Sequence, residues 1–140
     1  MKVKEIMTTG VQVIHPDDSL QAAAQKMSSH DIGFLPVLEA NHLVGVITDR
    51  DLVLRGVAQG MNSDAMLGRE VMTAPVIHCF EDQDVKDVAK LMEESQIRRL
   101  VVLSRSDGHL VGVVSLGDLA LKSKPDTSAE VLQRVSEPVG

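Results

Sequence analysis

The feature that most constrains this chain is that its second half repeats its first half. The segment KEIMT at residues 4–8 returns as REVMT at 69–73, and LVGV at 43–46 returns at 110–113. The second pair is spaced two residues wider than the first. The extra residues fall within 104–109, where Asp107-Gly108 is a hairpin turn signal. A repeat that changes length only at a turn indicates two copies of one folding unit.

Each copy has the hydrophobic pattern of a strand, a helix, two strands and a second helix. In the first copy, residues 11–15 predict a strand that Pro16 ends. Asp18 and Gln21 have capping-box spacing before a helix with an apolar face of Leu20, Ala23, Ala24 and Met27. Strands at 34–38 and 43–47 are expected to pair antiparallel, and a second helix to span 48–59. The second copy predicts the same elements at 76–80, 84–95, 100–103, 110–114 and 115–122.

This pattern predicts an α+β fold of tandem β-α-β-β-α repeats. A unit of about 60 residues is marginally stable alone, so we expect the two copies to pack sheet to sheet about a pseudo-two-fold axis. Two symmetry-related clefts would then lie between the copies. The expected boundaries are repeat one at 1–60, a linker at 61–67, repeat two at 68–122 and a C-terminal tail at 123–140. Thr127 and Glu130 have the spacing of a cap for a short helix in the tail.

Composition excludes several classes of function. The net charge is −6 without a basic stripe, and Trp and Tyr are absent, which argues against nucleic-acid binding. The apolar runs are too short for a membrane helix, and the lone Cys79 suits a reducing compartment, so we expect a cytoplasmic protein that does not enter a membrane. The five histidines lack metal-ligand spacing, and no phosphate loop or nucleophile–base pair is evident. We therefore expect no metal, no catalytic cofactor and no enzyme activity.

One short motif recurs where the third strand of each copy passes into the second helix. Thr48 is followed at three residues by Asp51, and Ser115 by Asp118. Both patterns fit a simple helix cap. They also fit a ligand site, because free N–H groups at a helix start suit a phosphate and an aspartate can accept hydrogen bonds from ribose hydroxyls. Both interpretations stay open from the residues alone.

The order of these motifs resembles a known family. Two units with a Val-Met-Thr type of start, an apolar-Pro-Val strand and a Gly-apolar-apolar-Thr/Ser-x-x-Asp exit resemble a cystathionine-β-synthase (CBS) domain pair, also called a Bateman module. The stretches SHDIGFLPV and TDRDLVLRGVAQG are most similar to small stand-alone bacterial CBS-pair proteins, some linked to hypoxia or stress. The resemblance implies a regulatory module that binds an adenosine nucleotide (AMP, ADP or ATP) between the repeats and pairs into a homodimer.

The resemblance also implies which residues line the two clefts, because each family site joins the Thr/Ser-x-x-Asp of one copy to the strands of the other. The first cleft would contain Thr48, Asp51, Pro75, Val76, Ile77, Ile97, Arg98 and Arg99. The second would contain Ser115, Asp118, Thr8, Val11, Gln12, Ile32, Gly33 and Phe34.

The two clefts differ in charge. Arg98 and Arg99 would give the first cleft partners for phosphate, unless they are solvated or paired with Glu93 or Glu94. The second has Gly33 and Phe34 at those positions, so we expect tighter nucleotide binding in the first. A bound nucleotide would stiffen the angle between the repeats and change a surface that an unknown protein partner reads. The alternative is a structural or protein-interaction module with empty clefts.

Overall fold

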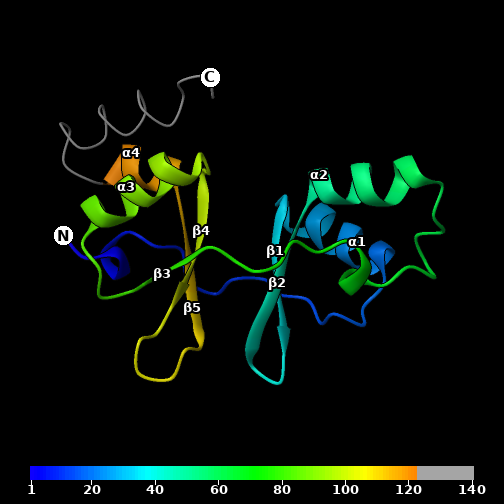
Figure 1. Cartoon of the computed structure of the whole chain (residues 1–140), viewed down its shortest axis with the longest axis horizontal. Helices are drawn as coiled ribbons and strands as arrows, with labels where there is room; N and C mark the ends of the chain where they lie inside the picture. Colours follow the sequence, from blue (N-terminus) through cyan, green and yellow to red (C-terminus); the bar gives the residue numbers. More distant parts are fainter. Residues whose placement is uncertain (123–140) are drawn as a thin grey trace. The chain divides into compact units, whose positions relative to one another are not determined.

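The computed structural model describes residues 1–122 and has the expected α+β class. The first sheet pairs β1 (Phe34–Glu39) with β2 (His42–Thr48), and the second contains β3 (His78–Phe80), β4 (Arg99–Leu103) and β5 (Leu110–Ser115). The helices are α1 (Leu20–His30), α2 (Asp49–Asp51), α3 (Val85–Ser95) and α4 (Leu116–Lys122) (Figure 1). The helix expected in the tail lies outside the described residues.

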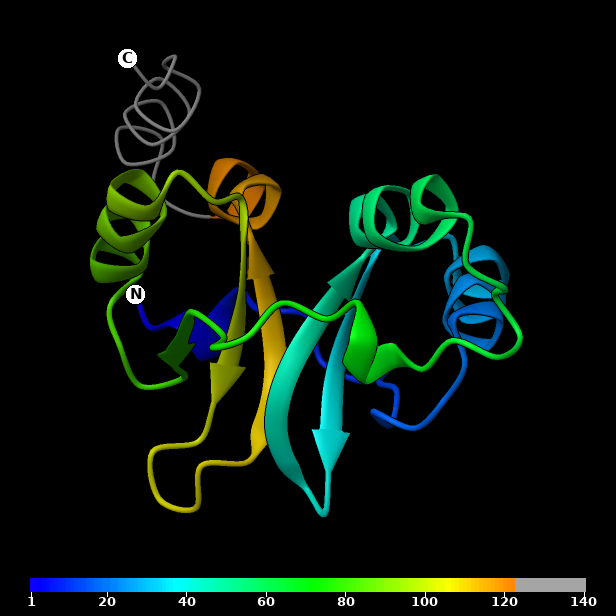
Figure 2. The same cartoon turned by 45° about the vertical axis from the view of Figure 1, so that its right-hand side comes forward.

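The two compact units of the chain do not coincide with the two sequence repeats. One unit contains Gln12–Val76, and the other joins Met1–Val11 to the residues from Ile77 onward. The short 3-10 turn Val3–Glu5 therefore packs with β3–β5, and the matching turn Gly68–Glu70 packs with β1 and β2 (Figures 1 and 2). Each repeat thus supplies its opening segment to the other repeat's unit.

Each hydrophobic core contains side chains from the opening segment of the other repeat. Val3 and Ile6, from the start of the chain, are buried in the core that α3, β4 and α4 build. Val71, from the start of the second repeat, is fully buried in the core of α1, β1 and β2. A unit assembled from one repeat alone would lack these side chains.

Both hairpins are antiparallel, as predicted. Phe34 is paired with Thr48 in the first, and Arg99 with Ser115 in the second. The first turn has positive φ at Ala40 and Asn41, as a two-residue hairpin loop requires. The longer second loop, residues 104–109, has positive φ at Gly108, where the sequence indicated a turn.

The strand predicted at residues 11–15 is wrong. Only Ile14 pairs there: its N–H donates to the Pro36 carbonyl at 3.0 Å and its carbonyl accepts from Leu38 at 2.9 Å. The next bonds of a parallel ladder would need N–H groups from Pro36 and Pro16, and proline has none. In the second repeat a glutamate replaces Pro16, and Glu81 donates to Leu103 at 3.0 Å. The strand predicted at 76–80 forms there over His78–Phe80 only.

The start of α1 also differs from the prediction. Its N-cap is Ser19, whose Oγ accepts the Ala22 N–H at 3.0 Å, rather than Asp18. The Asp18 carboxylate instead accepts the His15 N–H at 2.9 Å and closes the preceding turn. Ala24 is exposed, so the buried face of α1 consists of Leu20, Ala23 and Met27.

The helix predicted at 48–59 has the expected extent but not a uniform geometry. After α2, the chain widens to a π-helical turn at Leu52–Gly56, tightens to a 3-10 turn at Val57–Gln59 and ends at left-handed Gly60. Gly56 lies directly against the Leu20 side chain, and a Cβ at this position would overlap a terminal methyl of Leu20, so a larger residue requires the buried Leu20 side chain to move. Single π turns of this kind often mark functional positions.

Two glycines allow a sharp test of the exchanged packing. A Cβ at Gly112 would lie 2.8 Å from both the Met7 sulfur and the Thr8 carbonyl oxygen, whereas at Gly45 its nearest neighbours belong only to the Met72 side chain. Gly112→Ala should therefore lower the free energy of unfolding by about 1–3 kcal/mol. Gly45→Ala should cost less, because a methionine side chain can move. Urea denaturation followed by circular dichroism measures both; an equal or larger loss for Gly45→Ala contradicts this packing.

Candidate functional site

The turn at Thr48 forms a capping box at the start of α2, in which Thr48 and Asp51 each accept the other's backbone N–H. The Asp51 carboxylate accepts the Thr48 N–H at 2.9 Å, and the Thr48 hydroxyl accepts the Asp51 N–H at 3.2 Å. The extended backbone of Thr48 ends β2 and directs these two groups toward each other. The capping interpretation of the motif is therefore confirmed in the first repeat.

The second repeat builds the same turn. The Asp118 carboxylate accepts the Ser115 N–H at 2.9 Å, and the Ser115 hydroxyl accepts the Asp118 N–H at 3.0 Å. The Asp51 and Asp118 side chains are only 12% and 16% exposed. Each uses one oxygen for the cap, and a carboxylate offers about four acceptor positions, so both retain capacity for further donors.

A cation lies four residues after each aspartate. The Arg55 guanidinium lies 3.6 Å from the second oxygen of Asp51, and the Lys122 ammonium lies 3.3 Å from that of Asp118. Both cations also donate to the opening segment of their own unit: Arg55 to the Val71 carbonyl at 3.0 Å, and Lys122 to the Ile6 carbonyl at 3.3 Å. Sequence reasoning missed both residues. The available signal was a cation at the same distance from the aspartate in both repeats.

Inside each unit, the Thr/Ser turn lies beside the first residues of the neighbouring strand. Phe34 is the register partner of Thr48, and the Asp49 N–H donates to the Gly33 carbonyl at 3.0 Å. In the other unit Arg99 is the partner of Ser115, and the Leu116 N–H donates to the Arg98 carbonyl at 2.8 Å. The structure therefore brings together, within one unit, residues that the sequence assigned to different clefts.

The residues expected to line each cleft come from both units. Of the first set, Thr48, Asp51, Pro75 and Val76 belong to the unit 12–76, and Ile77, Ile97, Arg98 and Arg99 belong to the other. Of the second set, Gln12, Ile32, Gly33 and Phe34 belong to the unit 12–76, and Thr8, Val11, Ser115 and Asp118 belong to the other. Pro75 follows a cis peptide bond and is exposed, as are Thr8 and Ile77, while Val11, Gln12, Ile32, Val76 and Ile97 are half-buried.

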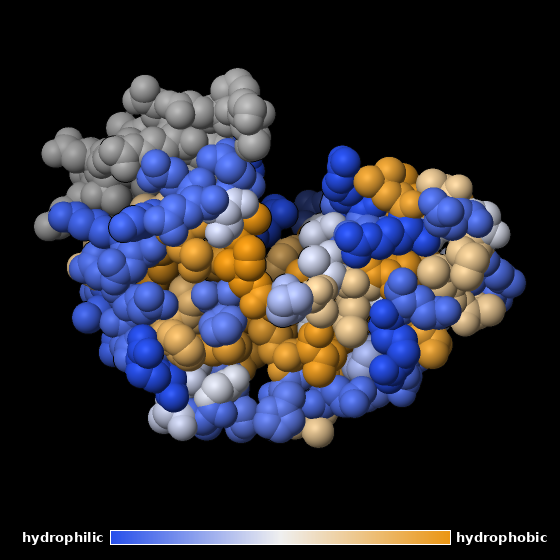
Figure 3. All heavy atoms as spheres, viewed as in Figure 1, coloured by the Kyte–Doolittle hydropathy of each residue, from blue (hydrophilic) through white to orange (hydrophobic). Residues whose placement is uncertain are grey.

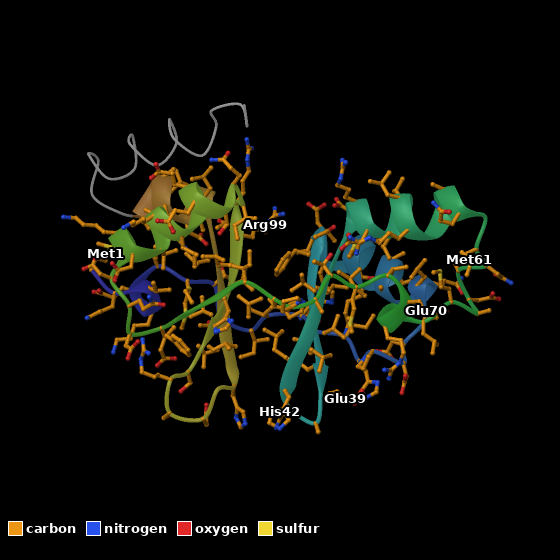
Figure 4. The ribbon with its side chains drawn as sticks, in the orientation of Figure 1. Met1, Glu39, His42, Met61, Glu70 and Arg99 are labelled. Carbon is orange, nitrogen blue, oxygen red and sulfur yellow. The ribbon has the colours of Figure 1, made fainter. Side chains whose placement is uncertain are left out.

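The charges of the two turns differ as well. Asp49 of the first repeat folds over Gly33, where a Cβ would lie 2.6 Å from its carboxylate oxygen. The second repeat has Leu116 and Arg98 at these positions. Arg98 and Arg99 are both exposed, and neither forms an ion pair within residues 1–122. Figure 4 labels Arg99 on β4. The ion pair between these arginines and Glu94, one of the alternatives from the sequence, is not observed. Glu94 lies 3.9 Å from the Lys90 ammonium instead.

An open depression of about 360 Å³ lies beside the first turn, and the sequence did not indicate it. It is lined by Asp49, Arg50, Val53 and Leu54. Further along the chain, Val57 of the helical segment and Met61 just after it are 68% and 45% exposed. Figure 3 shows apolar atoms on the surface of this helical stretch.

The one cysteine and the histidines do not form a redox or metal site in the described residues. Cys79 is buried, and the loss of hydration raises the pKa of its thiol to about 12, so the thiol stays protonated near neutral pH. His42 and His109 are exposed in the two hairpins. Among residues 1–122 there is no cluster of three or more His, Cys, Asp or Glu side chains that could hold a metal ion. No helix in that part is long and apolar enough to cross a membrane.

Comparison with known proteins shows the family. The model of the CBS domain matches residues 3–57 and 68–124, so the chain belongs to the CBS-domain family, as a tandem pair. It is 39% identical over 127 residues to the CBS domain-containing protein YhcV of Bacillus subtilis, covering 91% of this chain and 89% of that protein. The predicted family and repeat architecture are thereby confirmed.

Two solved structures are informative. Hypoxic Response Protein I, solved with two coordinated zinc ions, is 33% identical with a TM-score of 0.79, covering 89% of this chain and all of that one. The CBS domain pair of protein MJ0100, solved with 5′-methylthioadenosine and S-adenosyl-L-methionine, is 30% identical with a TM-score of 0.75, covering 86% and 93%.

The caps themselves can be tested without a ligand. Thr48→Ala and Ser115→Ala should each lower the free energy of unfolding by about 1 kcal/mol, because the first-turn N–H loses its acceptor. Thr48→Ser keeps the hydroxyl and should be nearly neutral. Urea denaturation measures the three variants, and a Thr48→Ala protein as stable as the wild type would show that the turn does not depend on this bond.

Proposed function

We propose that this protein is a non-catalytic regulatory module that binds an adenosine-containing ligand, with AMP, ADP or ATP as the expected nucleotides. The carrying observation is the repeated Thr/Ser-x-x-Asp turn, in which a nearly buried carboxylate keeps free acceptor positions after it has capped the helix. A related CBS pair was solved with two adenosine-containing ligands, which supports this ligand class.

Each group in the proposed sites has a distinct chemical task. The remaining lone pairs of Asp51 and Asp118 would accept hydrogen bonds from ribose hydroxyls. Arg98 and Arg99 are exposed cations that suit phosphate oxygens. The aliphatic side chains of the two sets, such as Val76, Ile77, Ile32 and Ile97, would enclose the adenine ring. A ligand that touched both repeats would favour one arrangement of them, which a partner protein could then recognise. We also propose a cytoplasmic location, which suits a chain whose one cysteine, Cys79, cannot form an internal disulfide.

A binding screen tests the proposed function. Because the chain lacks Trp and Tyr, purified protein should hardly absorb at 280 nm, and a clear band at 260 nm would report a co-purified nucleotide. Thermal shift should be measured with AMP, ADP, ATP, NAD and S-adenosylmethionine. A ligand at 100 times its dissociation constant should stabilise the protein by about 2.7 kcal/mol. The absence of both a 260 nm band and any shift would favour the ligand-free interaction module.

Substitutions in the two sets test which site binds more tightly. Arg99→Ala should weaken nucleotide binding by about tenfold, as expected for loss of a charged hydrogen bond to phosphate. Phe34→Ala should change affinity by no more than about twofold. Calorimetry with the nucleotide that binds the wild type measures both. The ranking is wrong if only Phe34→Ala weakens binding.

A second proposal concerns self-association into a homodimer. Val53, Leu54 and Val57 form an uncharged, exposed row on the helical segment after β2, and the exposed Met61 follows just past its end at Gly60. Arg55 of that segment turns instead to the carbonyl of Val71. Asp49 and Arg50 at one end of the row carry opposite charges, so two copies can meet here without a net like-charge barrier. An exposed apolar row of this kind commonly marks a protein contact.

The homodimer proposal predicts a concentration-dependent dimer that one charge disrupts. Val57→Glu should raise the dissociation constant of the dimer by at least tenfold, because the carboxylate would be buried at the centre of the contact. Lys86→Glu introduces a carboxylate on the exposed face of α3, an element that does not contribute to this row, and is the control. Sedimentation equilibrium measures the dissociation constants. A wild-type monomer at high micromolar concentration, or an unaffected Val57→Glu dimer, excludes this surface.

A further inference from the structure

We propose that Arg55 is a positioning residue that holds the Asp51 turn and the chain leading to Pro75 and Val76 in one fixed arrangement. This inference rests on the proposed ligand function, since Asp51, Pro75 and Val76 belong to the expected first binding set. It adds a residue that does not touch the ligand in that proposal but joins two parts that would.

The contacts of the Arg55 guanidinium carry the argument. One of its nitrogens donates to the Val71 carbonyl at 3.0 Å and to the Thr73 hydroxyl at 3.1 Å, with the Met72 carbonyl at 3.4 Å. The same nitrogen lies 3.6 Å from the Asp51 carboxylate oxygen that the cap does not use. Arg55 therefore joins the carboxylate of the turn to three consecutive residues that lie far away in sequence.

Helix spacing and backbone hydrogen bonds fix the two parts that Arg55 joins. Asp51 and Arg55 are four residues apart on one helical face, so the guanidinium lies beside the carboxylate. Thr73 is fixed from its other side, because its N–H and carbonyl exchange bonds with Val46 of β2 at 2.8 Å and 3.1 Å. The chain reaches Pro75 only two residues later. A shift of residues 71–73 would therefore move Pro75 and Val76 relative to Asp51.

The second repeat provides an internal comparison. Lys122 takes the place of Arg55, and it reaches Asp118 at 3.3 Å and the Ile6 carbonyl at 3.3 Å. One guanidinium nitrogen of Arg55 reaches two backbone carbonyls and the Thr73 hydroxyl of its opening segment, whereas the Lys122 ammonium reaches one carbonyl of its own. In this unit the corresponding threonine, Thr8, is held by its backbone bonds with Val113 and not by the cation. The cation of the first repeat thus contacts more of its opening segment than the cation of the second repeat does.

Hydrogen exchange and calorimetry together test the proposal on the full chain. In Arg55→Ala, amide exchange of residues 71–73 without ligand should accelerate by about five- to tenfold, as expected for loss of charged hydrogen bonds. Arg55→Lys, which copies the second repeat, should give a smaller acceleration. Thr73→Val removes one acceptor with little change of shape and should also give part of the effect. Lys90→Ala removes a cation from exposed α3 and should leave these amides unchanged.

Affinity is then measured with AMP, ADP, ATP and S-adenosylmethionine, using whichever binds the wild type. Arg55→Ala should weaken the tighter site by about fivefold or more, and Arg55→Lys should restore part of the loss. Unchanged exchange in Arg55→Ala overturns the contact. Accelerated exchange with unchanged affinity overturns the positioning role. A wild type that binds none of the four probes overturns the proposed function and the ligand role of Arg55 together, and the exchange data still decide the contact.

Discussion

The structure depends on an exchange of opening segments between the two repeats. Residues at the start of the chain complete the unit of the second repeat, where Met7 covers Gly112 and Thr8 exchanges backbone bonds with Val113. Met72 and Thr73 do the same for Gly45 and Val46 in the other unit. Without this exchange each unit would lack core side chains such as Val3 or Val71. A unit of about 60 residues is only marginally stable even with a complete core, so this loss would matter. The Met-Thr start and the Gly of the later strand are therefore two halves of one packing contact.

The exchange also places the candidate site. Each aspartate of the Thr/Ser-x-x-Asp turn neighbours a cation, and that cation holds the exchanged segment. Cap, cation and opening segment thus form one connected polar group at the start of each second helix. The carboxylates are nearly buried yet keep free acceptor positions, and an arrangement of that kind suits a ligand with neighbouring hydroxyls. The stabilising and ligand-binding interpretations of the motif are compatible, because they use different lone pairs.

Much of this architecture could be predicted from the sequence. The internal repeat, the short apolar runs of β1–β2 and β4–β5, and the apolar face of α1 predicted the fold class and both hairpins. The absence of a full strand at 11–15 could not be predicted from the pattern of these residues alone, because it depends in part on a proline in the facing strand, Pro36. The exchange was equally hidden, since a repeated sequence does not say which copy an opening segment joins. Arg55 was missed because two of its four partners are backbone carbonyls, which carry no sequence signal, and Thr73 lies 18 residues away in the chain.

The exchange itself is tested most directly by methyl NOE spectroscopy on protein with ¹³C-methyl methionine, of which the chain has seven. The account predicts NOEs from the Met7 methyl to the α-protons of Gly112 and from the Met72 methyl to those of Gly45. NOEs from Met7 to Gly45 and from Met72 to Gly112 would mean that each repeat closes on its own opening segment, and would contradict the account.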